Sequence, residues 1–304
     1  MTKIAAWQFG TRTCAAIANA SRDAFARTEA HDVEIEVGFA RDERVLLGAF
    51  QRACDVPDAD RARAIVRGTP GAAVRVGRGT LVVLVSLARI DCDESQILNR
   101  HVRPILRALR RVGCAANYFG RDWIAVGGRP VGHVGFAHER APRDGRVRAV
   151  VEAFVAVRGA PFAVTTRASH RGKTIATLEE LRGKPVDDDA LVARVVDELG
   201  AIEDGAIARE PNEEERTNAD PPWSARVEEA IGPVCAGRDA RGVMRVGGEF
   251  MASFDAVRDL EDRVESGQEI RSAVNDAFGA PHTALFGVRS LESIARALED
   301  AKNR

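Results

Sequence analysis

The stretch that most constrains the fold runs from Ile65 to Leu87. It consists of IVRGTPGAAVRVGRGT, which carries four glycines and three arginines, followed directly by the apolar run LVVLVSL. This run is rich in β-branched residues and follows a glycine-rich turn, which predicts a buried strand. A second β-branched run, AAVRV, lies just before it, and the Gly-Arg-Gly between the two runs predicts a β-hairpin.

The glycines and arginines of residues 65–80 allow two interpretations. Glycine leaves backbone N–H groups free to bind an anion, and an arginine can bind a carboxylate or phosphate through two hydrogen bonds. Alternatively, the glycines only satisfy turn geometry and the arginines face water. The stretch is not a P-loop because it contains no lysine, and it is not a dinucleotide-binding turn because a strand follows it.

Strand-like and helix-like segments alternate along the rest of the chain. Apolar runs bounded by glycine or charged residues predict strands at 44–49, 114–119, 122–126, 129–138, 147–157 and 242–254. Helical spacing, with acidic starts and glycine ends, predicts helices at 57–66, 93–113, 187–200, 256–267 and 290–301. Pro104 inside the second helix indicates a kink or a late helix start. The pattern predicts the α+β class.

One segment without apolar periodicity divides the chain. REPNEEERTNADPPWS, from Arg209 to Ser224, is acidic and contains three prolines, which predicts a linker. We therefore expect a domain at 1–210, a linker at 211–224 and a second domain at 225–304, sizes that suit independent domains.

Composition narrows the class of protein. Acidic and basic residues nearly balance, 45 against 44, so the net charge of −1 gives no support for a nucleic-acid or anionic-membrane partner. No apolar run approaches the roughly 18 residues of a membrane span, and the start of the chain does not read as a signal peptide. Five widely spaced cysteines without a CxxC motif indicate reduced thiols rather than disulfides or a metal site. We expect a cytoplasmic protein.

Several segments together resemble one superfamily, that of lipoate–protein ligases, octanoyltransferases and biotin–protein ligases. The family loop Arg-x-x-Gly-Gly-Gly-Ala-Val-x-His aligns without a gap with RGTPGAAVRV, where Arg67, Gly71 and Ala73 match. A second signature, an aspartate, a short strand and Gly-(Arg/Lys)-Lys, aligns with DWIAVGGRP, where Asp122 and Gly128 match. HRGKTIATLEEL, at 170–181, is similar to a third family segment, and GEFMASFDAVRDLEDRVESG resembles the accessory domain of lipoate–protein ligases.

The resemblance implies a fold and an activity. The fold is a mixed, largely antiparallel sheet flanked by helices, followed by a small α+β accessory domain. The activity is binding of a small carboxylic acid, lipoate or octanoate, its conversion to an acyl-adenylate with ATP and Mg²⁺, and acyl transfer to a lysine of a lipoyl-type carrier domain. The residues implied in ligand or nucleotide binding are Arg67, Gly71, Ala72, Ala73, Arg75, Asp122 and Gly128.

The chain departs from the family at the positions that carry the chemistry. Pro130 stands where the family has a lysine, whose ammonium stabilises the oxyanion that develops in acyl transfer. Proline has no donor to offer. Pro70 and Ala72 replace two of the three loop glycines, Val76 replaces the histidine, and Arg121 replaces the asparagine before the aspartate.

Two cations could replace the lost charge in an active enzyme. Lys173 is one of only four lysines in the chain and lies in the third matching segment. Arg129 precedes Pro130, but adjacent residues of a strand point to opposite faces of the sheet. Cys114 is a further nucleophile to consider. The alternative is a non-catalytic protein of the same fold that binds an acyl ligand or a partner. Either activity requires residues 67–79 and 122–136 to form two walls of one slot.

Overall fold

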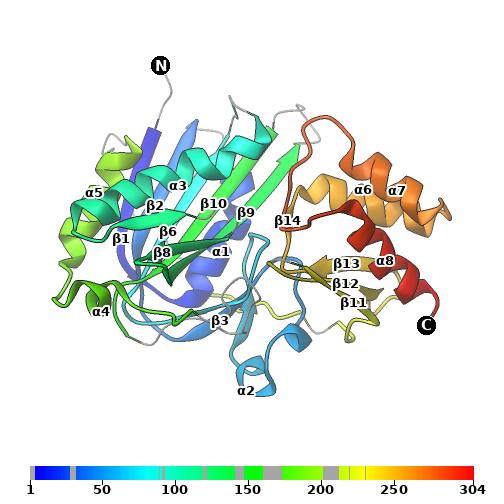
Figure 1. The fold of residues 1–304 in the computed structure, drawn as a ribbon, viewed down its shortest axis with the longest axis horizontal. Coiled ribbons are helices and arrows are strands. Elements are labelled where there is room, and N and C mark those ends of the chain that lie inside the picture. The colour runs from blue at the N-terminus through cyan, green and yellow to red at the C-terminus, as the bar shows by residue number, and fades with distance from the viewer. Residues whose placement is uncertain are drawn as a thin grey trace.

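The structure is a computed structural model that describes residues 4–27, 32–88, 90, 93–118, 122–140, 147–159, 173–200, 212–218, 220–229 and 231–304. An N-terminal part is built on a large sheet, and a C-terminal part, yellow to red in Figure 1, combines a smaller sheet with three helices.

Seven strands form the large sheet, in the order β1, β2, β6, β10, β9, β8, β7. Only β1 and β2 are parallel neighbours, and every other neighbouring pair is antiparallel. The predicted mixed, largely antiparallel sheet is therefore confirmed. The strands are β1 (Ile4–Arg12), β2 (Val33–Ala40), β6 (Thr80–Leu87), β7 (Ala116–Tyr118), β8 (Trp123–Val126), β9 (Arg129–Arg140) and β10 (Val147–Ala156).

The strand predicted from LVVLVSL is β6, and both of its faces are covered. Leu81, Val83 and Val85 lie in the largest core, which also contains residues of α3 and α5, whereas Val82 packs with α1 on the other face. A strand that is buried on both faces needs apolar residues at nearly every position. The helices of this part are α1 (Cys14–Arg27), α2 (Asp58–Arg61), α3 (Glu94–Arg111), α4 (Leu178–Arg182) and α5 (Asp188–Leu199).

A small sheet of three strands, in the order β4, β3, β5, corrects the predicted hairpin. It contains β3 (Arg44–Leu47), β4 (Ala64–Val66) and β5 (Val74–Val76). The predicted hairpin is wrong, because β5 pairs with β3 while β6 belongs to the large sheet. Gly79, at φ +86°, turns the chain from one sheet into the other, and such a glycine turn has the same sequence signature as a hairpin turn.

Two helix predictions also change. The helix predicted over 57–66 ends at Arg61. Residues 64–66 instead form a strand that pairs with β3, and this pairing buries the side chain of Ile65. The helix predicted over 93–113 begins at Glu94 and continues through Pro104, so the late start is wrong.

The C-terminal part has its own apolar core. β11 (Ala225–Glu229), β12 (Gly232–Arg238) and β13 (Met244–Gly248) form an antiparallel sheet that contacts α6 (Phe254–Glu265) and α8 (Leu291–Lys302). α7 (Ile270–Phe278) packs between these two helices. A short ribbon of β14 (Met251–Ala252) and β15 (Leu285–Phe286) contacts β9, and Met251 reaches the large core.

Residues 212–218 and 220–224 have no regular structure, and they bind to the N-terminal part. Val66 N–H donates to the carbonyl of Arg216 at 2.8 Å. The Asn19 amide on α1 donates to the carbonyls of Asn212 and Glu214 at 2.6 and 3.1 Å. The predicted linker is therefore fastened along the surface of the N-terminal part. Division of the chain into two domains remains our interpretation.

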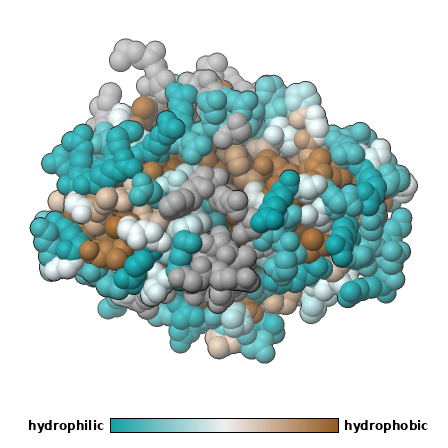
Figure 2. All heavy atoms as spheres, in the orientation of Figure 1, coloured by the Kyte–Doolittle hydropathy of each residue, from teal (hydrophilic) through white to brown (hydrophobic). Residues whose placement is uncertain are grey.

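Most of the face seen in Figure 2 is hydrophilic, and a band of hydrophobic atoms crosses its upper middle toward α6 and α7. Among the described residues, no helix combines the length and apolar character needed to cross a membrane. The described cysteines, which are Cys14, Cys54, Cys114 and Cys235, are all free thiols.

His138 on β9 and Ser253 before α6 join the two parts of the molecule. His138 Nδ1 lies 2.8 Å from Ser253 Oγ, and both side chains are buried. Burial lowers the pKa of His138. The nearby carboxylates of Asp255 and Glu94 oppose this shift, whereas the basic side chains of His282 and Arg140 reinforce it. The lowered pKa of His138 favours the neutral form of the buried imidazole.

We expect the free energy of unfolding to fall as pH drops below about 6.5, because the unfolded histidine binds a proton that the buried imidazole resists. The contribution of His138 is complete above that pH and declines by at most about 1.4 kcal/mol per pH unit until the lowered folded pKa is reached. Urea unfolding at about pH 7.5 and about pH 5.5, compared between the wild type and His138→Gln, measures it. An equal pH dependence in both proteins would contradict the assignment.

Candidate functional site

Arg67, which directly follows β4, is buried inside the loop that it was expected to line. Its Nε donates to Thr69 Oγ1 at 2.9 Å, and its Nη1 donates to the carbonyls of Leu46 and Ala72 at 3.0 and 2.8 Å. Its guanidinium also forms an ion pair of 3.2 Å with Glu152 of β10. Arg67 therefore holds the loop to β3 and to the large sheet.

Glu152 is the buried acceptor of this network. Its side chain is fully buried, and it accepts a hydrogen bond of 2.5 Å from the Thr69 hydroxyl. Burial raises the pKa of Glu152, while the adjacent Arg67 guanidinium opposes that rise. In this arrangement the charge of Arg67 is compensated within the protein, so an anionic ligand would have to compete with Glu152 for it.

The loop and β9 come together as expected, but here they are in direct contact. Phe136 N–H donates to the Pro70 carbonyl at 3.3 Å. A Cβ on Gly135 would lie only 2.4 Å from Thr69 Oγ1, so the close approach of the loop requires glycine. Gly71 adopts φ +120°, a conformation that glycine tolerates. The two expected walls are therefore in direct contact at residues 69–71 and 134–136.

One face of the large sheet carries the polar and aromatic side chains of the candidate site. Trp123 pairs with His133, His133 pairs with Phe154, and Gly135 pairs with Glu152. Residues that pair directly project from the same face, as do residues two apart on a strand. The Arg67 guanidinium lies 5.6 Å from the Phe154 ring, so the loop covers this same face.

Lys173 lies over this face. Its Nζ is 5.8 Å from the centre of the Trp123 ring, and the side chain is exposed. Residues 173–177 run beside the start of β9, where Ala176 N–H donates to the carbonyl of Pro130 at 3.0 Å. The segment that carries Lys173 is therefore attached at the position where the family has its lysine.

Arg129 contributes to this attachment. Its Nε and Nη2 donate to the carbonyls of Thr174 and Ile175 at 3.0 and 3.1 Å, and Nη2 also pairs with Glu180 at 2.7 Å. Arg129 lies five residues before Val134, or roughly 16 Å along the strand. The structure thus gives Arg129 contacts that position the Lys173 segment and places it away from the Arg67 loop.

Asp122 and His133 form a buried pair next to Trp123. Asp122 Oδ2 lies 3.9 Å from His133 Nδ1, and Asp122 is fully buried. The Asp122 carbonyl accepts a hydrogen bond from Val134 N–H at 2.8 Å, which fixes β8 against β9. A carboxylate at this position could orient a donor on a ligand bound over the same strands.

The remaining predicted site residues fall into two groups. Ala72 and Ala73 are buried in the loop close to Arg67. Arg75 is half-buried and pairs with Asp60 at 2.7 Å, and Gly128, at φ +78°, is an exposed residue of the β8–β9 turn. The structure therefore does not bring Gly128 to the Arg67 loop.

Burial argues against thiol chemistry at Cys114, and the cavity beside Glu152 is small. The Cys114 side chain is buried, and burial raises the pKa of its thiol, which disfavours the thiolate nucleophile. A cavity that borders Glu152 between α1 and β6 has a volume of about 10 Å³. That is room for about one water molecule, so this cavity does not hold an acyl tail.

Sequence reasoning missed Glu152 and Thr69. Glu152 interrupts the apolar run VRAVVEAFVAV at 147–157. A carboxylate in the middle of a buried strand requires a cation or donors, and this signal could have identified it. Thr69 carries no comparable signal, because threonine is ordinary in a loop.

Comparison with known proteins identifies the fold. No protein-family model and no curated protein matched the chain. Among solved structures, the bipartite lipoate–protein ligase of Thermoplasma acidophilum, described with its E2 lipoyl domain, aligns over 68% of this chain and 88% of its own, with a TM-score of 0.52 at 16% identity. Lipoate–protein ligase A bound with ATP aligns over 68% and 90%, with a TM-score of 0.51 at 18% identity.

A third structure covers nearly the entire chain. LipL1 of P. falciparum in complex with lipoate aligns over 98% of both chains, with a TM-score of 0.59 at 11% identity. At identities this low the likeness concerns the fold. The chain thus has the fold of the lipoate–protein ligases, as the resemblance of its motifs predicted.

Proposed function

We propose that the protein binds a small carboxylic acid of the lipoate or octanoate type, activates it with ATP and transfers the acyl group to a lysine of a lipoyl-type carrier domain. Support comes from the fold, since structures with this fold include one described with its lipoyl domain, one bound with ATP and one in complex with lipoate. The observation that carries the proposal is the position of Lys173 over Trp123, on a segment bound to Pro130.

The reaction needs a cation beside the reacting carbonyl. A carboxylate oxygen of the acid attacks the α-phosphorus of ATP, and pyrophosphate leaves. The neutral amine of the carrier lysine then attacks the carbonyl carbon of the acyl-adenylate, AMP leaves, and the amine loses a proton to solvent. In both steps negative charge develops on oxygen, and a fixed positive donor stabilises it. Lys173 would supply this charge in place of the family lysine.

The other residues would position the reactants. Arg129 holds the backbone of Thr174 and Ile175, and so fixes the segment from which Lys173 projects. Asp122, buried beside His133, would orient the nucleotide. Arg67 would support the loop through Ala72 rather than contact the acid, unless the ligand displaces Glu152. Mg²⁺ enters the proposal as the ion that accompanies ATP.

A second candidate is a non-catalytic protein that binds an acyl ligand or a partner. It is favoured by the Arg67–Glu152 ion pair, which compensates the loop arginine internally, and by Pro130, which removes the family donor. The direct contact of Thr69 with Gly135 also narrows the space for a substrate.

Turnover separates the two candidates. We expect purified protein with ATP, Mg²⁺ and either lipoate or octanoate to release pyrophosphate and to form the acyl-adenylate, detected by mass spectrometry. Calorimetric binding of either acid without any effect of ATP and without pyrophosphate would favour the non-catalytic candidate. Absence of both binding and turnover with both acids would contradict the proposed substrate class.

A further inference from the structure

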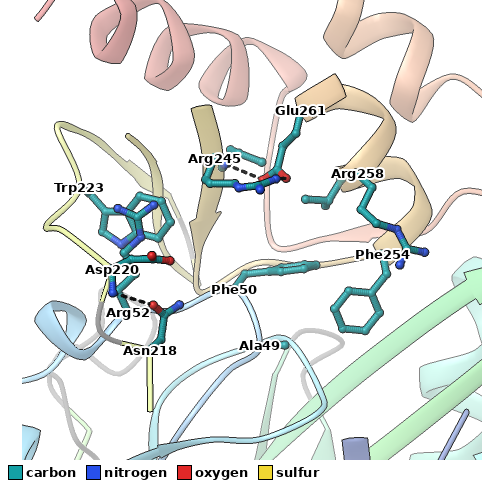
Figure 3. A pocket seen from close by; sticks show the side chains of 12 residues that line it. Ala49, Phe50, Arg52, Asn218, Asp220, Trp223, Arg245, Phe254, Arg258 and Glu261 are labelled. Carbon is teal, nitrogen blue, oxygen red and sulfur yellow. Dashed lines mark hydrogen bonds and ion pairs between the residues drawn. The ribbon is translucent and has the colours of Figure 1, made fainter. Parts of the chain in front are cut away.

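A cavity of about 200 Å³ lies at the junction of the two parts, well apart from Lys173 in the sequence and lined by other elements (Figure 3). Three stretches of chain surround it: the turn after β3, the segment before β11, and the face formed by β13 and α6. Its lining includes Ala49, Phe50, Arg52, Asp220, Trp223 and Phe254.

Arg52 is a buried cation that keeps an unused donor. The residue is 1% exposed, and its guanidinium stacks 3.5 Å from the centre of the Trp223 ring, as Figure 3 shows. Its Nη1 donates to the carbonyls of Pro221 and Arg238 at 2.5 and 3.2 Å, whereas its buried Nη2 has no hydrogen-bond partner. A buried guanidinium donor without an acceptor is costly, and a ligand oxygen would relieve that cost.

The positive charges of the other two arginines that line the cavity are already balanced by carboxylates in ion pairs. Arg245 pairs with Asp239 at 3.0 Å and with Glu261 at 2.6 Å, and Arg258 pairs with Glu139. Within the described residues, no carboxylate forms an ion pair with Arg52. Asp220 lines the same cavity and acts on Arg52 only from a longer distance. Arg52 is therefore the cation at this cavity that lacks an anionic oxygen.

The opposite wall of the cavity is apolar. The rings of Phe50 and Phe254 meet edge to face at 5.2 Å, and Ala49 and Val257 extend this surface. Figure 3 shows Phe254 across the cavity from Trp223 and Arg52. A ligand that bonds to Arg52 would place the rest of its atoms against these side chains, which favours an apolar body.

The geometry points to a second ligand site at this junction, which binds a small organic acid with its carboxylate on Arg52 Nη2 and its apolar body against Phe50 and Phe254. A volume of 200 Å³ is below the roughly 300–1,000 Å³ of sites for drug-sized ligands. Acids such as benzoate and hexanoate match this size. Because both parts of the molecule line the site, an acid bound here stabilises their contact.

Titration calorimetry on the full chain, with benzoate and with hexanoate as probes, tests this site. We expect saturable binding of both acids that does not depend on ATP. Arg52→Gln removes the charged donor and should weaken binding by about 10- to 100-fold. Ala49→Leu leaves Arg52 in place but fills the cavity, and should weaken binding at least as strongly. Arg296→Gln, at an exposed arginine of α8, is the matched control and should bind as the wild type does.

Three results would overturn the assignment. The first is absence of saturable binding of either acid up to about 10 mM, well beyond the Kd expected of a weak specific site. The second is unchanged affinity in a folded Ala49→Leu protein, which decides the matter even where Arg52→Gln fails to fold. The third is tighter binding of inorganic phosphate than of both acids, which would assign the site to a phosphate group. Benzoate is not a substrate of the proposed reaction. If benzoate does not bind to this cavity, the proposed activation of lipoate or octanoate is therefore unaffected.

Discussion

Replacing Glu152 with alanine is expected to lower the free energy of unfolding by about 3–5 kcal/mol. The change leaves the Arg67 guanidinium buried without its carboxylate and removes the acceptor of the Thr69 hydroxyl. Urea unfolding at neutral pH, followed by circular dichroism, measures the loss. Glu152→Gln keeps an oxygen acceptor and the side-chain volume, so its destabilisation should be smaller.

The paired substitution of both ionic partners provides the control. Arg67→Met combined with Glu152→Leu removes both charges and should recover much of the stability that Glu152→Ala loses, because no buried charge then remains unpaired. If Glu152→Ala alone were as stable as the wild type, Arg67 would not depend on Glu152, and our account of the loop would be wrong.

Replacing Lys173 with alanine is expected to lower the rate of acyl-adenylate formation by about 10²–10³, the usual effect of removing one donor that stabilises developing negative charge on oxygen. Lys173→Arg keeps the charge in a different geometry and should retain part of the rate. The turnover number in the pyrophosphate assay, with lipoate and ATP at saturation, is the measurement. Lys184→Ala, at an exposed lysine after α4, is the matched control and should leave the rate unchanged.

The binding of lipoate distinguishes this effect from general damage to the protein. If Lys173 acts on the reacting carbonyl, Lys173→Ala should lower the turnover number much more than it weakens lipoate binding. An active wild type whose rate survives Lys173→Ala would show that another group supplies the charge. Pro130→Lys would then test whether a cation at the family position raises the rate.

Elements that rest on local interactions could be predicted from the sequence. The helix expected at 187–200 is α5, where the Asp187 carboxylate accepts a hydrogen bond from Ala190 N–H, and Gly200 ends the helix at φ +72°. Both capping interactions lie within a few residues of the helix end, so the sequence carries the whole signal. The continuous β-branched run of β6 likewise indicated a strand, although its coverage on both faces is known only from the structure.

Pairing between distant segments could not be predicted in the same way. Ile65 and its neighbours fit a helix by local pattern, but β3 binds them as a strand. The motifs placed Arg67 in a loop, yet its direction depends on Glu152, which lies in a strand far along the chain. Likewise, the approach of Lys173 to Trp123 depends on how residues 173–177 pack beside β9.

The attachment of residues 212–218 to α1 and β4 determines how far the C-terminal part can travel. Because Val66 and Asn19 hold this stretch by its backbone carbonyls, and Arg52 holds the carbonyl of Pro221, little free chain remains before β11 begins at Ala225. A large rotation of the C-terminal part relative to the N-terminal part would first have to break these hydrogen bonds.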